Sequence, residues 1–127
     1  MKRWFDSGIR YPHTIGIHAF LFSTACFTLN DYPDVILWVG GLMLTVHLFY
    51  TISLVRKGTP PLPIGVCDAV CTILQIFVLS WSSKVNGFAS GLGSGFGLFF
   101  YQVMLVGFLI LMIFALPIAY CTRKTPQ

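Results

Sequence analysis

Eleven of the twelve charged side chains in this 127-residue chain lie outside four long apolar stretches. A helix needs about 20 predominantly apolar residues to cross the roughly 30 Å hydrocarbon core of a bilayer. The stretches predict spans over residues about 14–29, 35–55, 62–81 and 97–121, of which the first is short. We therefore expect an all-α integral membrane protein in which residues 1–127 form a single four-helix transmembrane bundle.

The composition agrees with this class and excludes others. Hydrophobic residues make up 56% of the chain and charged residues only 9%, whereas about a quarter of the residues of a soluble domain are charged. The net charge of +4 does not indicate a nucleic-acid partner, because the basic residues lie in short clusters at the ends of the apolar stretches. The expected partners are membrane lipids and other membrane subunits or further copies of the chain.

The lysines and arginines predict the orientation of the bundle. In a four-span topology seven of the eight fall on one side and only Lys84 falls on the other. An excess of basic residues marks the cytoplasmic side of a membrane protein. Both termini and the 56–61 loop are therefore expected on that side, and the 30–34 and 82–95 loops on the opposite side. The seven residues are Lys2, Arg3, Arg10, Arg56, Lys57, Arg123 and Lys124.

Asp68 is the one charged residue inside an apolar stretch, about six residues from the start of the third span. An ionisable side chain at membrane depth is energetically costly and commonly marks a functional position. At helical spacing it shares a face with Gly65, Thr72 or Cys71, and Gln75, which predicts a polar stripe pointing into the bundle. The stripe would either line a cavity or ion path, or supply hydrogen bonds that hold neighbouring helices together.

Two histidines belong to the same hypothesis. His18 and His47 lie in the first and second spans, within about one helical turn of the depth of Asp68. Three such groups can form a structural hydrogen-bonded cluster, a proton or ion pathway, or a metal or haem site. Cys67 and Cys71 are additional candidate ligands, although their spacing is not that of a Cys-x-x-Cys metal motif. The pattern favours the structural cluster, and no metal or other cofactor is predicted.

The glycine-rich segment before the fourth span predicts close helix packing. Gly91 and Gly95, and Gly93 and Gly97, form two overlapping Gly-x-x-x-Gly spacings. Small residues four positions apart allow two helix backbones to approach closely. We expect a turn that enters a closely packed helix.

The sequence favours a non-enzymatic function. It contains no glutamate and lacks Gly-x-Ser-x-Gly, His-Glu-x-x-His and nucleotide-binding loop motifs. The first hypothesis is therefore an accessory, assembly or scaffold subunit of a membrane complex. A small oligomeric channel or transporter that uses the Asp68 stripe is the alternative. A metal- or haem-dependent membrane redox subunit is a second alternative.

Overall fold

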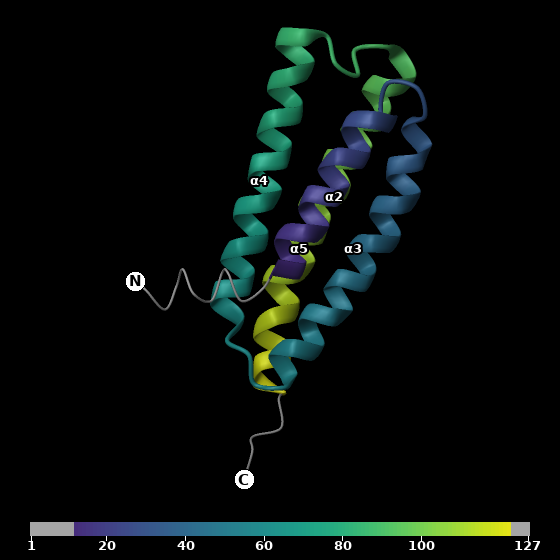
Figure 1. Ribbon diagram of the computed structural model, residues 1–127. Helices are drawn as coiled ribbons and strands as arrows, with labels where there is room; N and C mark the ends of the chain where they lie inside the picture. Colours follow the sequence, from purple (N-terminus) through teal and green to yellow (C-terminus); the bar gives the residue numbers. More distant parts are fainter. Residues whose placement is uncertain (1–11, 123–127) are drawn as a thin grey trace.

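The computed structural model describes residues 12–122 and is all-helical over that range. Four helices follow one another in alternating directions along the long axis of the bundle (Figure 1). Each helix packs against two neighbours, so that α2 contacts α3 and α4, and α5 contacts the same two helices from the opposite side. The helices are α2 (Pro12–Thr28), α3 (Pro33–Arg56), α4 (Pro61–Asn86) and α5 (Leu92–Cys121).

Three links between helices define the two ends of the bundle. The link between α3 and α4 (57–60) lies at what we call the loop end, together with the last residues of α5 (Figure 1). The links 29–32 and 87–91 lie at the opposite end, the turn end. There the backbone N–H of Ala89 donates to Oδ1 of Asn30 over 2.7 Å. This hydrogen bond joins the two links and fixes α2 and α3 relative to α4 and α5 at that end.

Proline and glycine set the helix boundaries. Pro33 and Pro61 each occupy the first helical position, where a missing N–H costs no hydrogen bond and a fixed φ suits the helix. α4 ends at Gly87, whose φ of 69° is left-handed and whose N–H bonds to the carbonyl of Ser82. A left-handed glycine at this position is a common helix terminator.

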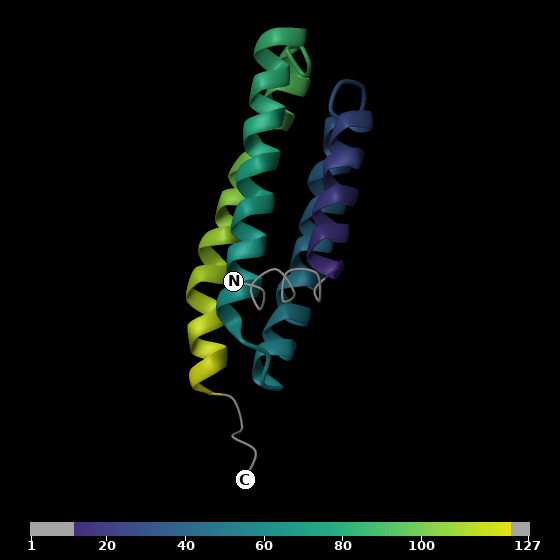
Figure 2. The same ribbon diagram turned by 60° about the vertical axis from the view of Figure 1, so that its left-hand side comes forward.

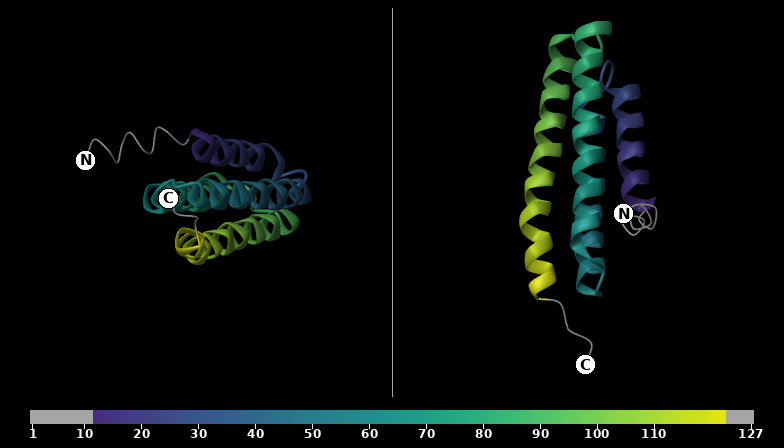
Figure 3. Two further views of the ribbon diagram at one scale, coloured as in Figure 1. Left: turned by 90° about the horizontal axis from the view of Figure 1, so that it is seen from below. Right: turned by 90° about the vertical axis from the view of Figure 1, so that its left-hand side faces the viewer.

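Three of the four helices, α3, α4 and α5, are long and apolar enough to cross a membrane. α2 has 17 residues and is therefore only about 26 Å long at 1.5 Å per residue. Figures 2 and 3 show that α2 begins well above the loop end, where α3, α4 and α5 continue without it. The short first span predicted from the sequence corresponds to this helix.

The predicted 82–95 loop is largely helical. α4 continues to Asn86 and α5 begins at Leu92, which leaves only residues 87–91 as a link. Ser82 to Asn86 contain no proline or glycine to stop α4, and the glycines after Leu92 weaken a helix without preventing it. The predicted 82–95 loop is therefore too long, because serine and glycine favour turns but do not prevent a helix here.

The outer surface of the bundle is apolar. Leu92, Phe27 and Trp38 expose 83%, 82% and 81% of their surface. Monomeric soluble proteins rarely expose large contiguous apolar areas, so this surface suits lipid chains or other apolar protein. Of the basic residues used to predict orientation, Arg56 and Lys57 lie at the loop end and Lys84 near the turn end. The remaining ones, Lys2, Arg3, Arg10, Arg123 and Lys124, lie outside the described residues.

Candidate functional site

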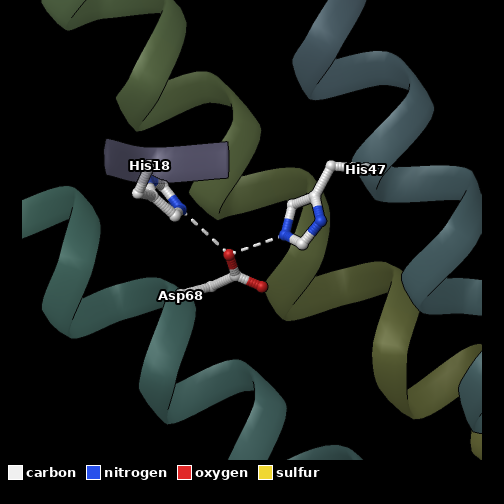
Figure 4. Close-up of side chains that lie close together, drawn as sticks. All are labelled: His18, His47 and Asp68. Atoms are coloured by element: carbon white, nitrogen blue, oxygen red, sulfur yellow. Dashed lines mark hydrogen bonds and ion pairs between the residues drawn. The ribbon is translucent and has the colours of Figure 1, made fainter. Parts of the chain in front are cut away.

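The structure brings Asp68, His18 and His47 together in the interior of the bundle. His18 Nε2 lies 3.0 Å and His47 Nε2 lies 2.9 Å from the same carboxylate oxygen, Asp68 Oδ1. The three side chains come from α2, α3 and α4, and both hydrogen bonds converge on one oxygen (Figure 4). Asp68 and His47 are fully buried and His18 is 3% exposed. This aspartate therefore bonds to two other helices without contact with solvent or lipid.

The cluster extends to the fourth helix through Gln75 and Tyr101. The Gln75 amide nitrogen lies 2.7 Å from His18 Nδ1, and the Tyr101 hydroxyl donates to Gln75 Oε1 over 2.6 Å. Gln75 is 4% exposed and Tyr101 is fully buried. We call Asp68, His18, His47, Gln75 and Tyr101 the polar cluster. It connects all four helices by hydrogen bonds.

The direction of these bonds determines the tautomer of His18. The amide nitrogen of Gln75 is a donor, so the His18 Nδ1 that it faces must be the acceptor. A neutral imidazole has one donor and one acceptor, so Nε2 of His18 carries the proton and donates it to Asp68. The bonds from Tyr101 through Gln75 and His18 therefore all point toward the carboxylate, which suits an ionised aspartate.

Several polar atoms of the interior lack a hydrogen-bond partner within residues 12–122. They include Asp68 Oδ2 and His47 Nδ1, which lie in the cluster itself. The buried hydroxyls of Thr14, Thr51 and Thr72 also lack a hydrogen-bond partner within residues 12–122. Other threonine hydroxyls of the chain bond to the carbonyl four residues earlier, as Thr24 and Thr45 do. Unsatisfied buried polar atoms are uncommon in native proteins and require an explanation.

Thr72, predicted as a member of the stripe, lies one turn beyond Asp68 on the same buried face of α4. Its side chain is in the interior, but its hydroxyl makes no hydrogen bond to the described residues. Gly65, also on the predicted stripe, is half-buried and faces Leu116 of α5. The stripe therefore contributes Asp68 and Gln75 to the cluster and Thr72 to its surroundings.

Aromatic rings also contact His47. The ring centroid of His13 lies 5.6 Å from that of His47, and the ring of Phe108 stacks on His47 at 5.7 Å. His13 also makes an edge contact with Tyr50 at 4.8 Å. His47 therefore packs against aromatic rings in addition to its hydrogen bond to Asp68.

Buried side chains border the polar cluster at both ends, and only those toward the turn end are all apolar. Toward the turn end, the buried residues one turn away are leucines on each helix, namely Leu21, Leu44, Leu79 and Leu98. Toward the loop end, Ile64 lies one turn from Asp68 on α4, whereas the buried residues one turn from His18 and His47 are Thr14 and Thr51. A groove of about 480 Å³ between α4 and α5 near the loop end is lined by apolar residues and includes no member of the cluster.

The four glycines predicted to pack helices differ in their surroundings. A Cβ at Gly97 would lie 2.5 Å from Cβ of Pro33, so α5 and the start of α3 approach closely there. A Cβ at Gly95 would meet the carbonyl oxygen of Ala89 at 3.4 Å, within the turn itself. Gly91 precedes α5, and a Cβ at Gly93 would meet nothing within 4 Å. Of these four glycines, only Gly97 lies in close contact with a neighbouring helix.

The cysteines do not take part in the cluster. Cys67 and Cys71 are half-buried on α4, and Cys26 and Cys121 are exposed. Among the described residues, the one group of potential metal ligands consists of His18, His47 and Asp68. The thiols considered as additional ligands are not part of it.

Sequence reasoning missed Tyr101. The hypotheses drawn from the sequence do not include this residue, which lies four positions after the start of the predicted span 97–121. A buried tyrosine hydroxyl usually finds a hydrogen-bond partner. Its position near one end of the predicted span is equally typical of an interface tyrosine, so the sequence carries no signal that separates the two roles.

The fold and the composition define an all-helical protein whose three longest helices can span a membrane. Comparisons with protein-family models, with curated proteins and with solved structures gave no match to this chain.

Proposed function

We propose that this chain is a four-span membrane protein that acts as a non-enzymatic subunit of a membrane assembly, either with other subunits or with further copies of itself. In this proposal the polar cluster holds the bundle together. The apolar outer surface provides the contacts with lipid and with partner helices.

The proposal includes α2 as a fourth span. α2 packs between α3 and α4, and its His18 bonds to Asp68 in the middle of the bundle. A bilayer can adapt to a helix that is a few ångströms too short by thinning locally or by extension of flanking side chains. With four spans, the segments before α2 and after α5 lie on the same side as Arg56 and Lys57, which the positive-inside rule assigns to the cytoplasm.

The observation that carries the proposal is the contrast between a closed polar interior and an exposed apolar exterior. The members of the cluster are at most 4% exposed among the four helices, and the groove between α4 and α5 is lined by none of them. The exterior, by contrast, exposes large side chains along its length, including Phe77, Phe99 and Phe114. Aromatic residues are enriched at the contacts between protein subunits.

The test is the composition of the assembly under mild conditions. The full chain, expressed at native level with a small tag, is extracted in lipid nanodiscs and analysed by native mass spectrometry. We expect a defined complex that contains other membrane subunits or a fixed number of copies. A homogeneous monomer across several lipid compositions would contradict the proposal.

The channel alternative makes a different prediction. A single bundle has a layer of buried leucines on the turn-end side of the cluster, so an ion path through it would require this layer to separate or several copies to assemble around a pore. Purified protein in liposomes should therefore show no proton or cation flux above that of empty liposomes. Flux that is lost in Asp68→Asn and kept in Asp34→Asn would replace the subunit proposal with a channel.

A further inference from the structure

The polar cluster has the geometry of an incomplete metal-ion site. One ligand atom from each of His18, His47 and Asp68 lies within 4.8 Å of the other two, and all three residues are buried. In a tetrahedral zinc site with bonds of about 2.0 to 2.1 Å, ligand atoms lie about 3.3 Å apart. The two N···O distances of 3.0 and 2.9 Å are a few tenths of an ångström below that value, so small side-chain rotations would open a position between the three residues.

The donor set indicates the class of ion. Imidazole nitrogens suit zinc, copper, iron and nickel, whereas magnesium and calcium prefer oxygen ligands. Two imidazoles and one carboxylate form a ligand set found in zinc and non-haem iron sites. Because the three ligands are buried and come from three different helices, we expect an ion that connects helices.

A second observation supports this assignment independently of the ligand distances. Both hydrogen bonds to Asp68 use the same oxygen, while Oδ2 of this fully buried residue has no partner within residues 12–122. A buried carboxylate oxygen without a hydrogen bond is strongly unfavourable. A cation between Asp68 and the two histidines would interact with this oxygen.

Gln75 and Tyr101 are placed to support the histidine on α2. A metal-bound imidazole donates its second N–H to an acceptor, which fixes its orientation. When His18 binds through Nε2, its proton is on Nδ1, and a half-turn of the Gln75 amide presents Oε1 to it. The Tyr101 hydroxyl, now 2.6 Å from the amide group, then accepts from the Gln75 nitrogen, because a phenol can donate or accept.

We propose that His18, His47 and Asp68 bind one divalent first-row transition-metal ion, with zinc as the reference ion, and that this ion joins α2, α3 and α4. Three protein ligands leave one coordination position open, and one carboxylate offsets half of the charge of the ion. The site is therefore expected to bind less tightly than a structural zinc site with four protein ligands.

The experiment measures zinc in the full chain purified in detergent. The protein is stripped with a chelator, loaded with Zn²⁺ alone, passed through a desalting column and analysed for metal content. We expect about one zinc per chain, with binding at least tenfold weaker in His47→Gln and Asp68→Asn. Removal of a partner of a ligand commonly weakens a metal site by about 10- to 100-fold, so Gln75→Leu should fall in that range.

Two control variants test the assignment of the ligands. His13→Gln removes a neighbouring histidine that is not a member of the proposed site, and Cys67→Ser with Cys71→Ser removes two thiols on α4. Both should retain wild-type zinc content. Loss of zinc in the cysteine variant, with retention in His47→Gln, would assign the metal to the thiols and overturn the proposal.

A measurement on the wild type alone decides the case if the ligand variants do not fold. X-ray absorption of the zinc-loaded chain should show a nitrogen and oxygen shell at about 2.0 Å and no sulfur at about 2.3 Å. A sulfur shell, or a chain that retains no zinc, overturns the proposal. Neither result affects the proposed subunit function. Native mass spectrometry tests assembly, which the proposal assigns to the outer surface, whereas the zinc measurements test metal binding in the interior.

Discussion

Two polar contacts between helices of this bundle differ in burial and in charge. In the polar cluster, Asp68 is fully buried and accepts hydrogen bonds from His18 and His47. Between α4 and α5, the Gln102 amide donates to the Ser80 hydroxyl over 2.7 Å, and both residues are half-buried. The bond lengths are similar, and only the cluster contains ionisable groups.

The difference shows that hydrogen-bond length is a poor measure of energetic importance in a membrane protein. A half-buried neutral pair can exchange its bond for another polar group when the helices separate, and such pairs contribute on average about 0.6 kcal/mol. A buried carboxylate that loses its hydrogen-bond donors finds no replacement for them in lipid. We therefore expect substitutions in the cluster to be several times more destabilising than substitutions in the Gln102–Ser80 pair.

The largest effect is expected for Asp68→Ala. Without the carboxylate, His18 and His47 lose their common acceptor in the interior, and breaking a buried ionic contact typically costs about 3 to 5 kcal/mol. Reversible unfolding by SDS in mixed micelles measures this loss. The matched control is Asp34→Ala, which removes an exposed aspartate from the first turn of α3 and should cost less than about 1 kcal/mol. Equal losses for the two variants would remove the distinction between buried and exposed acids.

Gly97→Ala tests whether close packing rivals the polar cluster. The new Cβ would lie 2.5 Å from Pro33 Cβ, and overpacking of this kind costs about 1 to 3 kcal/mol. Gly93→Ala is the control, because its Cβ meets nothing within 4 Å and alanine favours the helix by up to about 1 kcal/mol. The same unfolding assay compares them. If Gly97→Ala were more destabilising than Asp68→Ala, packing would dominate over the cluster.

Tyr101→Phe tests the outer part of the cluster. The substitution keeps the ring and removes the hydroxyl that bonds to Gln75, leaving a buried carbonyl oxygen unsatisfied at a cost of about 1 to 2 kcal/mol. Tyr32→Phe, at a residue 68% exposed, should have little effect in the same assay. If Tyr101→Phe left the free energy of unfolding unchanged, the cluster would end at Gln75.

Gln102→Leu should have the smallest effect. It removes the bond to Ser80 and a longer contact with the Ile76 carbonyl, and the expected loss is about 0.6 kcal/mol. A loss above about 2 kcal/mol would place this pair on the same level as the cluster.

The sequence indicated the helical membrane class because charge and hydropathy determine which segments can lie in lipid. The sequence indicates Asp68 by its charge within an apolar stretch and His18 and His47 by their similar depth, and the structure places both histidines within hydrogen-bond distance of Asp68. Depth does not give the rotation of each helix, so the sequence could not show that they meet, nor that Thr72 makes no bond. It also could not show that, of Gly91, Gly93, Gly95 and Gly97, only Gly97 meets a neighbouring helix, since this depends on the position of Pro33.

The sequence pattern also did not predict the helix boundaries near the turn end. Serine and glycine between Ser82 and Gly95 favour turns locally, but helices continue through most of this range. Tertiary contacts, including the bond from Ala89 to Asn30, fix a short link where local preference indicated a long loop.

The most direct test of the account is a pair of double-mutant cycles in one unfolding assay. One cycle combines His47→Leu with Asp68→Leu, and the other combines Ser80→Ala with Gln102→Leu. We expect a coupling of about 1.5 kcal/mol or more between His47 and Asp68, as found for close charged pairs, and about 0.6 kcal/mol between Ser80 and Gln102. Equal couplings, or a smaller value for His47 and Asp68, would contradict the claim that the polar cluster holds the bundle together.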